Sequence, residues 1–143
     1  MKKAAVLTMC ILATAGCDTR WVDPSAAQAS QDIYSVGRPS APTDARIVFT
    51  QDAGALSCFG AGMSVYLDDQ LAAETTSGKQ VTLYHPPGPT QLSIRNNAKC
   101  AGGDLRGLLL DLKAKHSYQV RGYRGTWDKA EPLLTTPAPY VYK

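Results

Sequence analysis

The stretch Met63–Arg95 constrains the fold most, because its apolar side chains recur at every second residue. The positions that follow this period are Met63, Val65, Leu67, Leu71, Ala73, Val81, Leu83, Leu92 and Ile94. A period of two places alternate side chains of a strand on one face, so one face enters a core and the other meets water. The stretch is therefore predicted to form a β-meander of short strands.

Three turn signals separate these strands. They lie at Asp68-Asp69, at Ser77-Gly78 and in the Pro-Pro-Gly-Pro run 86–89. The proline run is expected to lie outside any ladder, because proline lacks the amide donor that a central strand needs. Asp68 and Asp69 are interpreted as a turn and not as a cation site or a hydrolase carboxylate pair, because adjacent strand residues point to opposite faces.

Further strands are expected on both sides of this stretch. They are 45–50 before it, and 105–112, 116–124 and 133–135 after it. Helix and strand compete in 105–112, since its run of leucines has no clean period, and its length favours a strand. A chain of 143 residues has room for one domain. The prediction is an all-β protein, a small antiparallel β-sandwich over 45–136, followed by a C-terminal tail 137–143.

The first sixteen residues have the features of an export signal, with Lys2 and Lys3 preceding a short apolar run. The run ends in Thr-Ala-Gly-Cys, which resembles the lipobox of bacterial lipoproteins, although Thr14 stands where that motif usually has Leu. The resemblance implies that Cys17 receives a diacylglycerol and anchors the chain to a membrane. The alternative is ordinary cleavage that leaves Cys17 as a free thiol. Which membrane, inner or outer, is left open.

Residues 17–44 are rich in Ser, Ala, Pro and Asp and show no sustained periodicity. They are predicted to be a flexible linker with a reach of roughly 30 Å, which would let the domain stand clear of the lipid. Trp21, Ile33 and Tyr34 are the exceptions in this segment, and weak docking or disorder is favoured for them over insertion into the membrane.

A family resemblance covers about 45–136. Its segments are SVYLDDQLA, VTLYHPPGPTQLSI and LLLDLKAKHSYQVR, which look like the PEGA-like group of bacterial envelope lipoproteins of unknown function. Here Asp69, Lys115 and Ser117 depart from the turn residues of that group. The resemblance implies a small antiparallel, Ig-like β-sandwich with no known catalytic residues.

Cys58 and Cys100 are predicted to form a disulfide, because an exported domain meets an oxidising compartment and neither cysteine has metal-ligand spacing. Such a bridge would stabilise the domain by roughly 4 kcal/mol in the chain-entropy model. A cysteine nucleophile activated by His85 or His116 is disfavoured, since nothing in the sequence places a base beside a thiol. Two lone histidines do not suggest zinc. No metal or cofactor is expected.

Basic residues concentrate in the C-terminal part, where 95–143 holds 9 basic against 4 acidic residues. Alternation in 116–124 predicts a polar face that could meet an acidic partner, glycan phosphates or lipid headgroups. The candidate residues are Arg106, Arg121, Tyr123 and Arg124. An ordinary solvated sheet face is the alternative. Nucleic acid is not expected as a partner in this compartment.

These features together predict a membrane-anchored periplasmic lipoprotein of the bacterial cell envelope, a binding or assembly module that is not an enzyme. Its partner would be another envelope protein or peptidoglycan. One alternative is an inhibitor or immunity lipoprotein that presents the loops around Cys58 and Cys100 to a lysozyme-like hydrolase. Another is a structural subunit of an envelope or secretion complex that acts by strand addition.

Overall fold

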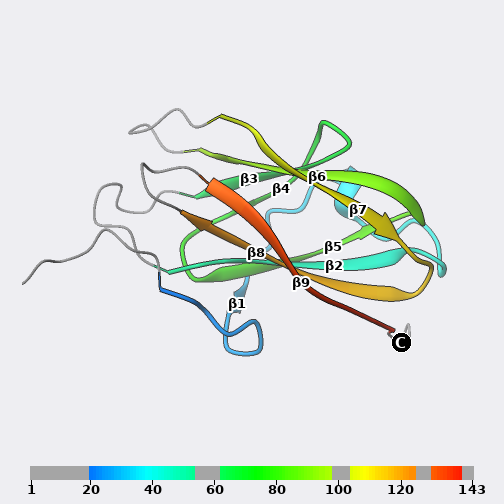
Figure 1. Cartoon of the computed structure of the whole chain (residues 1–143), viewed down its shortest axis with the longest axis horizontal. Coiled ribbons are helices and arrows are strands. Elements are labelled where there is room, and N and C mark those ends of the chain that lie inside the picture. Colours follow the sequence, from blue (N-terminus) through cyan, green and yellow to red (C-terminus); the bar gives the residue numbers. More distant parts are fainter. Residues whose placement is uncertain (1–19, 54–61, 98–103, 125–129, 140–143) are drawn as a thin grey trace, which may run out of the picture.

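The computed structural model describes residues 20–53, 62–97, 104–124 and 130–139, and they form two β-sheets that face each other (Figure 1). The predicted all-β sandwich is therefore confirmed. In sheet order, the five-stranded sheet contains β1 (Gln28–Ala29), β5 (Lys79–His85), β2 (Ala45–Gln51), β8 (His116–Arg124) and β9 (Ala130–Pro139). The four-stranded sheet contains β4 (Gln70–Thr75), β3 (Met63–Leu67), β6 (Gly88–Asn96) and β7 (Arg106–Leu112).

The core lies between the sheets and is built from the alternating apolar positions. Its largest members are fully buried, and they are Phe49, Ile47, Met63, Leu67, Leu83, Leu92, Ile94 and Leu110. Removal of this apolar surface from water is the main stabilising contribution to a fold of this kind. The competition in 105–112 is resolved as the strand β7, whose Leu110 and Leu112 are buried while Leu109, just before them, is exposed.

The predicted meander is wrong in its sheet order. Of the strands that follow one another in this stretch, only β3 and β4 pair. β5 leaves for the five-stranded sheet after the turn at Ser77-Gly78, and β6 returns to pair with β3. The reason is that a period of two gives each strand one apolar face but does not select the sheet that receives it. Val81 and Leu83 of β5 are buried from the opposite side of the core.

The prediction that Leu71 faces the core is wrong, because a β-bulge lies between β3 and β4. The register of β3 with β4 shifts between Val65 and Tyr66, so that Val65 pairs with Ala73 and Tyr66 with Leu71. The extra residue, Ala72, reverses the alternation. Leu71, expected on the core face, therefore lies opposite outward-facing Tyr66 and is half-buried.

The predicted turn at Asp68-Asp69 is confirmed. Both residues have positive φ, 46° and 64°, which is the backbone of the tight hairpin turns that match strand twist. Gly78, with φ of 79°, and Lys115, with φ of 57°, occupy the other tight turns. Gly78 adopts this conformation without strain because it has no Cβ.

The proline run is only partly outside the ladder, contrary to the prediction. β6 begins at Gly88, and Pro89 pairs with Asp111 of β7. Pairing of β6 with β3 starts only at Leu92, so Pro89 lies where β6 has a single neighbour in the described part of the chain. A missing amide donor is tolerated at such an edge.

Two further differences concern pairing and length. β2 pairs with β8 in parallel, as β1 does with β5, so the sandwich is not purely antiparallel. The last strand, β9, runs through Pro139 and thus beyond the expected end of the domain at Thr136. Among the described strands it pairs with β8 alone, and its three prolines suit an edge strand.

Residues 20–44, which we call the strap, are not the free linker that was predicted. Arg20 pairs with Ala53, β1 adds to the edge of β5, and Ile33 pairs with Ala73 on the edge of β4. Tyr34 N donates to Ala72 O at 2.9 Å. The strap thus covers one edge of each sheet, which blocks unwanted strand pairing there.

Side-chain packing, in addition to strand pairing, holds the strap on the domain. Ile33 and Val36 contact the core, and Gly37 in the 3₁₀ turn η1 (Ser35–Gly37) is buried. A Cβ at Gly37 would meet Leu83 Cδ2 at 2.6 Å, so the strap approaches β5 as closely as glycine allows. Weak docking was one expectation for Ile33, and these contacts are more extensive than that.

Asp44 closes the strap just before β2. Its Oδ2 accepts hydrogen bonds from Ser40 N at 2.7 Å, Ser40 Oγ at 2.9 Å and Ala41 N at 2.9 Å. Burial acts to raise the pKa of Asp44, but these donors and nearby His85 outweigh it and hold the pKa below its usual range. The carboxylate is therefore the form that stabilises this turn.

Candidate functional site

The candidate site lies on the outer face of the five-stranded sheet, where the strap crosses β2 and β8. Phe49 and Val120 point into the core, so the residues that follow them, Thr50 and Arg121, point outward. Thr50 and Arg121 are direct partners in the parallel ladder. Residues far apart in sequence thus share one surface.

An ion pair supports this surface. Arg121 Nε donates to Asp52 Oδ1 and Oδ2 at 2.9 and 2.8 Å, and its Nη2 also contacts Oδ2. The Asp52 side chain is completely buried, whereas that of Arg121 is 27% exposed. The guanidinium carbon also lies 5.4 Å from the centre of the Tyr123 ring. A buried carboxylate requires such a partner, so Arg121 is held in place by the fold.

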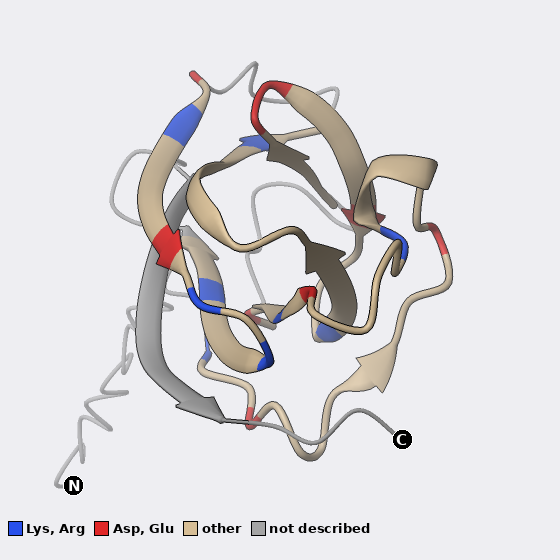
Figure 2. Cartoon of the chain, turned by 90° about the vertical axis from the view of Figure 1, so that its right-hand side faces the viewer, with Lys and Arg blue, Asp and Glu red and all other residues tan. Residues whose placement is uncertain are grey.

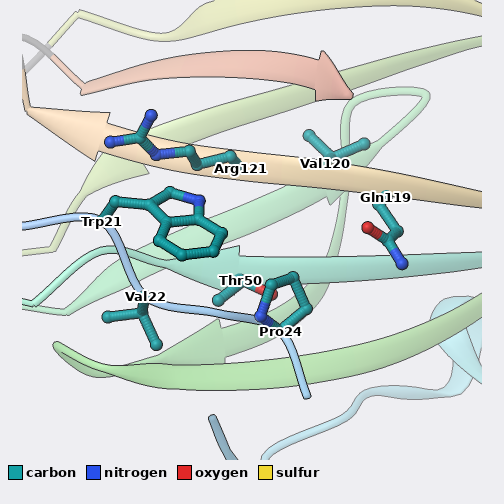
Figure 3. A pocket seen from close by; sticks show the side chains of 7 residues that line it. All are labelled: Trp21, Val22, Pro24, Thr50, Gln119, Val120 and Arg121. Carbon is teal, nitrogen blue, oxygen red and sulfur yellow. The ribbon is translucent and has the colours of Figure 1, made fainter. Parts of the chain in front are cut away.

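A pocket of about 120 Å³ opens between the strap and this sheet (Figure 3). Trp21, Val22 and Pro24 form its strap side. The sheet side is lined by Thr50, Gln119, Val120 and Arg121. Its walls are mainly apolar, with a few polar groups among them, as is usual for small-ligand sites.

Two residues of the pocket have unusual environments. Trp21 is 56% exposed, although it belongs to a segment that otherwise pairs with the domain. Thr50 is only 2% exposed, and its Oγ1 has no hydrogen-bond partner among the described residues. An exposed aromatic ring and a buried, unsatisfied hydroxyl therefore meet in one pocket.

The predicted interaction face is only partly assembled. Arg121 and Tyr123 lie together on the outer face, but Arg106 pairs with buried Ile94 and lies on the inner face of the other sheet. Arg106 Nε is buried there without a partner in the described part of the chain. Arg124 belongs to β8, and its side chain lies outside the description. The structure therefore separates Arg106 from Arg121.

The cysteine predictions concern residues outside the described ranges, namely Cys17, Cys58 and Cys100. The disulfide between Cys58 and Cys100 stays a prediction. The residues that border the two segments do meet, because Asn97 N donates to Gly62 O at 3.1 Å. Cys58 precedes Gly62 by four residues, and Cys100 follows Asn97 by three. The described residues next to the two cysteine-bearing segments are therefore neighbours on the sandwich.

The histidines lie at the opposite end and belong to turns. His85 Nε2 is 3.3 Å from Asp68 Oδ2, and its Nδ1 is 3.1 Å from Thr90 Oγ1. His116 Nδ1 is 2.9 Å from Ala114 O. In the view onto this end, acidic and basic residues are interspersed and do not collect by sign (Figure 2). Within the described ranges, no three His, Cys, Asp or Glu residues are grouped to hold a metal ion.

Sequence reasoning missed Thr50, Asp52 and the role of Trp21. Asp52 follows a strand directly, and a carboxylate in that position beside an arginine-bearing strand is a weak signal. Trp21 in a polar segment was a stronger one, since a large aromatic side chain without periodic neighbours often marks a contact. Thr50 carried no signal, because its burial depends on the strap.

The chain was compared with family models, curated proteins and solved structures. No family model matches it, and no curated protein matches it. A candidate cell adhesion protein from Bacteroides ovatus, known as a crystal structure, is similar at a TM-score of 0.43 and 10% identity. The match covers 71% of this chain and 46% of that one, so the chain spans less than half of that protein. At this level of similarity nothing about function is transferred.

In the ranges that the structure describes, no helix has the length and apolarity to cross a membrane.

Proposed function

We propose that this protein is an exported lipoprotein of the bacterial envelope, of the PEGA-like type, whose sandwich acts as a non-catalytic binding or assembly module close to a membrane. The lipid would be carried by Cys17. The observation that supports closeness is the pairing of Arg20 with Ala53. Arg20 N donates to Ala53 O at 2.7 Å, and Ala53 N donates to Arg20 O at 3.0 Å.

This pairing shortens the tether. Only Asp18 and Thr19 separate Cys17 from Arg20. Three extended residue steps reach about 10 Å, compared with the roughly 30 Å of a free linker. The lipidated residue would therefore hold the end of the sandwich that carries Arg20 and Ala53 against the membrane surface, and a partner would approach from the sides or from the far end.

Intact mass tests the anchor. The mature chain should exceed the mass of residues 17–143 by a diacylglycerol, and Cys17→Ser should remove this increment. An unmodified mass of the exported wild-type chain would overturn the lipoprotein proposal.

Trypsin tests the closeness. Arg20 offers the sole trypsin site between Cys17 and Arg46, because Arg38 precedes Pro39 and trypsin does not cleave that bond. In membranes, release of the domain should be slow, since cleavage after Arg20 requires the strap to open locally. A matched control carries Gly-Ser-Arg-Gly-Ser inserted between Asp18 and Thr19 and should be released quickly. Equal release rates would show that the domain is not held at Arg20.

A second candidate function is supported by β7. This strand pairs with β6 on one side and, within the described residues, with no strand on the other. Leu109 on it is 74% exposed and Leu105 just before it is 46% exposed. An exposed apolar edge strand is a template for pairing with another chain. We therefore also propose assembly through β7, as a structural subunit of an envelope complex.

A further inference from the structure

We infer that the pocket between the strap and the five-stranded sheet binds a neutral pyranose ring, as found in an uncharged glycan. The pocket is lined by Trp21, Val22 and Pro24 of the strap, by Thr50 of β2 and by Gln119, Val120 and Arg121 of β8 (Figure 3). This inference does not depend on lipidation of Cys17, and it names a ligand class that the proposed envelope function leaves open.

The unpartnered hydroxyl of Thr50 is the first argument. Thr50 is 2% exposed, lines the pocket, and its Oγ1 has no hydrogen-bond partner among the described residues. Buried polar groups in folded proteins almost always have a partner, so an orphaned hydroxyl at a pocket wall indicates a missing donor or acceptor. A ligand hydroxyl supplies both.

The aromatic wall is the second argument. Trp21 keeps 56% of its surface exposed while its neighbours in the strap pair with the domain. One face of a pyranose consists largely of C–H groups and is apolar, and its rim carries hydroxyls. Such a ring can lay its C–H face on the indole and on Pro24 while its rim reaches Thr50 and the Gln119 amide.

Charge and size narrow the class of ligand. Arg121 is the one charged side chain among the lining residues, and it is paired with the buried Asp52 carboxylate. The two charges offset each other, which favours an uncharged ligand over a phosphate or a carboxylate. A volume of about 120 Å³ accommodates a single ring and excludes an extended chain.

Saturation-transfer NMR on the full chain tests this inference, with methyl β-D-glucopyranoside as the neutral probe and methyl β-D-glucuronide as the charged one. The neutral probe should bind with a dissociation constant on the order of 1 mM, and its ring C–H protons should receive the strongest transfer. The glucuronide should bind at least about fivefold more weakly. No transfer to the neutral probe, or tighter binding of the glucuronide, would overturn the inference.

Three variants locate the binding. Thr50→Val keeps the side-chain shape and removes a hydroxyl that has no partner among the described residues, so the fold should tolerate it, and binding should weaken about tenfold. Trp21→Ala should abolish transfer. Thr82→Val is the matched control, because Thr82 pairs with Val48 on the same outer face and does not line the pocket. Unchanged binding in both Thr50→Val and Trp21→Ala would place the sugar elsewhere and contradict the site.

Discussion

The Arg121 guanidinium holds a carboxylate that water does not reach: its Nε lies 2.9 and 2.8 Å from the two oxygens of Asp52, whose side chain is completely buried. Asp52 follows the last residue of β2, and Arg121 lies on the neighbouring strand β8. The pair therefore joins the central strand β2 to its neighbour β8 in the five-stranded sheet.

Arg121→Met should lower the free energy of unfolding by about 3 kcal/mol, because it leaves the Asp52 charge buried without a partner. Urea denaturation measures this change. The double variant Asp52→Asn, Arg121→Met should recover part of the loss, since the remaining amide carries no charge. A single variant within about 0.5 kcal/mol of wild type would mean that Asp52 does not depend on Arg121.

Asp44 should make the strap sensitive to acid. Its pKa is held below the usual value of 3.8, so its contribution to stability is complete above that value and is lost as the pH falls through the lowered pKa. Asp44→Asn should cost about 1–3 kcal/mol at neutral pH and progressively less below pH 3.8. Denaturation at several pH values measures the difference. Asp111→Asn, an exposed carboxylate on β7, serves as the control, and a pH-independent difference for Asp44→Asn would contradict the prediction.

Gly122 should resist substitution. A Cβ there would meet Phe49 Cζ at 2.3 Å and Met63 Sδ at 2.9 Å, so Gly122→Ala should destabilise the domain by about 2 kcal/mol through overpacking. The matched control is Gly107→Ala in β7, where the nearest atoms are the ends of Gln91 and Ser93 at 3.1 Å. Thermal unfolding should show a clear loss for Gly122→Ala and little change for the control. Equal effects would show that β8 shifts to make room.

Detachment of the strap should expose sheet edges. Ile33→Asp places a charge where Ile33 packs against the core and pairs with Ala73. Amide exchange should then accelerate at Tyr34 and Glu74, whose amides donate to Ala72 O and Asp32 O, and the variant should aggregate more readily. Gln31→Asp adds the same charge at an exposed neighbouring position. If both variants exchange alike, Ile33 does not hold the strap.

Leu109→Lys tests assembly through β7. Leu109 is 74% exposed, so the free energy of unfolding should change by less than about 0.5 kcal/mol. A charge on an edge strand disfavours pairing with another chain. Cross-linking in envelope membranes should capture a partner with the wild-type chain and lose it with the variant, and Lys113→Gln, just after β7, should retain it. Retention of the partner by Leu109→Lys would exclude β7 as the contact.

Sequence periodicity predicted most of the strands and their buried faces. The burial of Val65, Leu83 and Ile94 and the tight turn at Asp68-Asp69 follow from local rules, because strand alternation and turn geometry involve residues adjacent in the chain. The same rules failed at Leu71 and Pro89. The position of Leu71 depends on a bulge between β3 and β4, and that of Pro89 on the point where β6 extends beyond the end of β3. Both are properties of pairs of strands.

By itself, then, the sequence determined an all-β domain with defined turns and most of the side chains that face its core. Tertiary structure alone decided that β5 crosses to the other sheet, that Arg106 and Arg121 lie on different sheets, and that the strap covers two sheet edges and forms a pocket over Thr50. The physical reason is the difference in sequence separation between the interacting residues. Alternation acts between neighbouring residues, whereas the choice of sheet, edge and outer face depends on contacts between segments far apart in the chain, whose free energy no local pattern records.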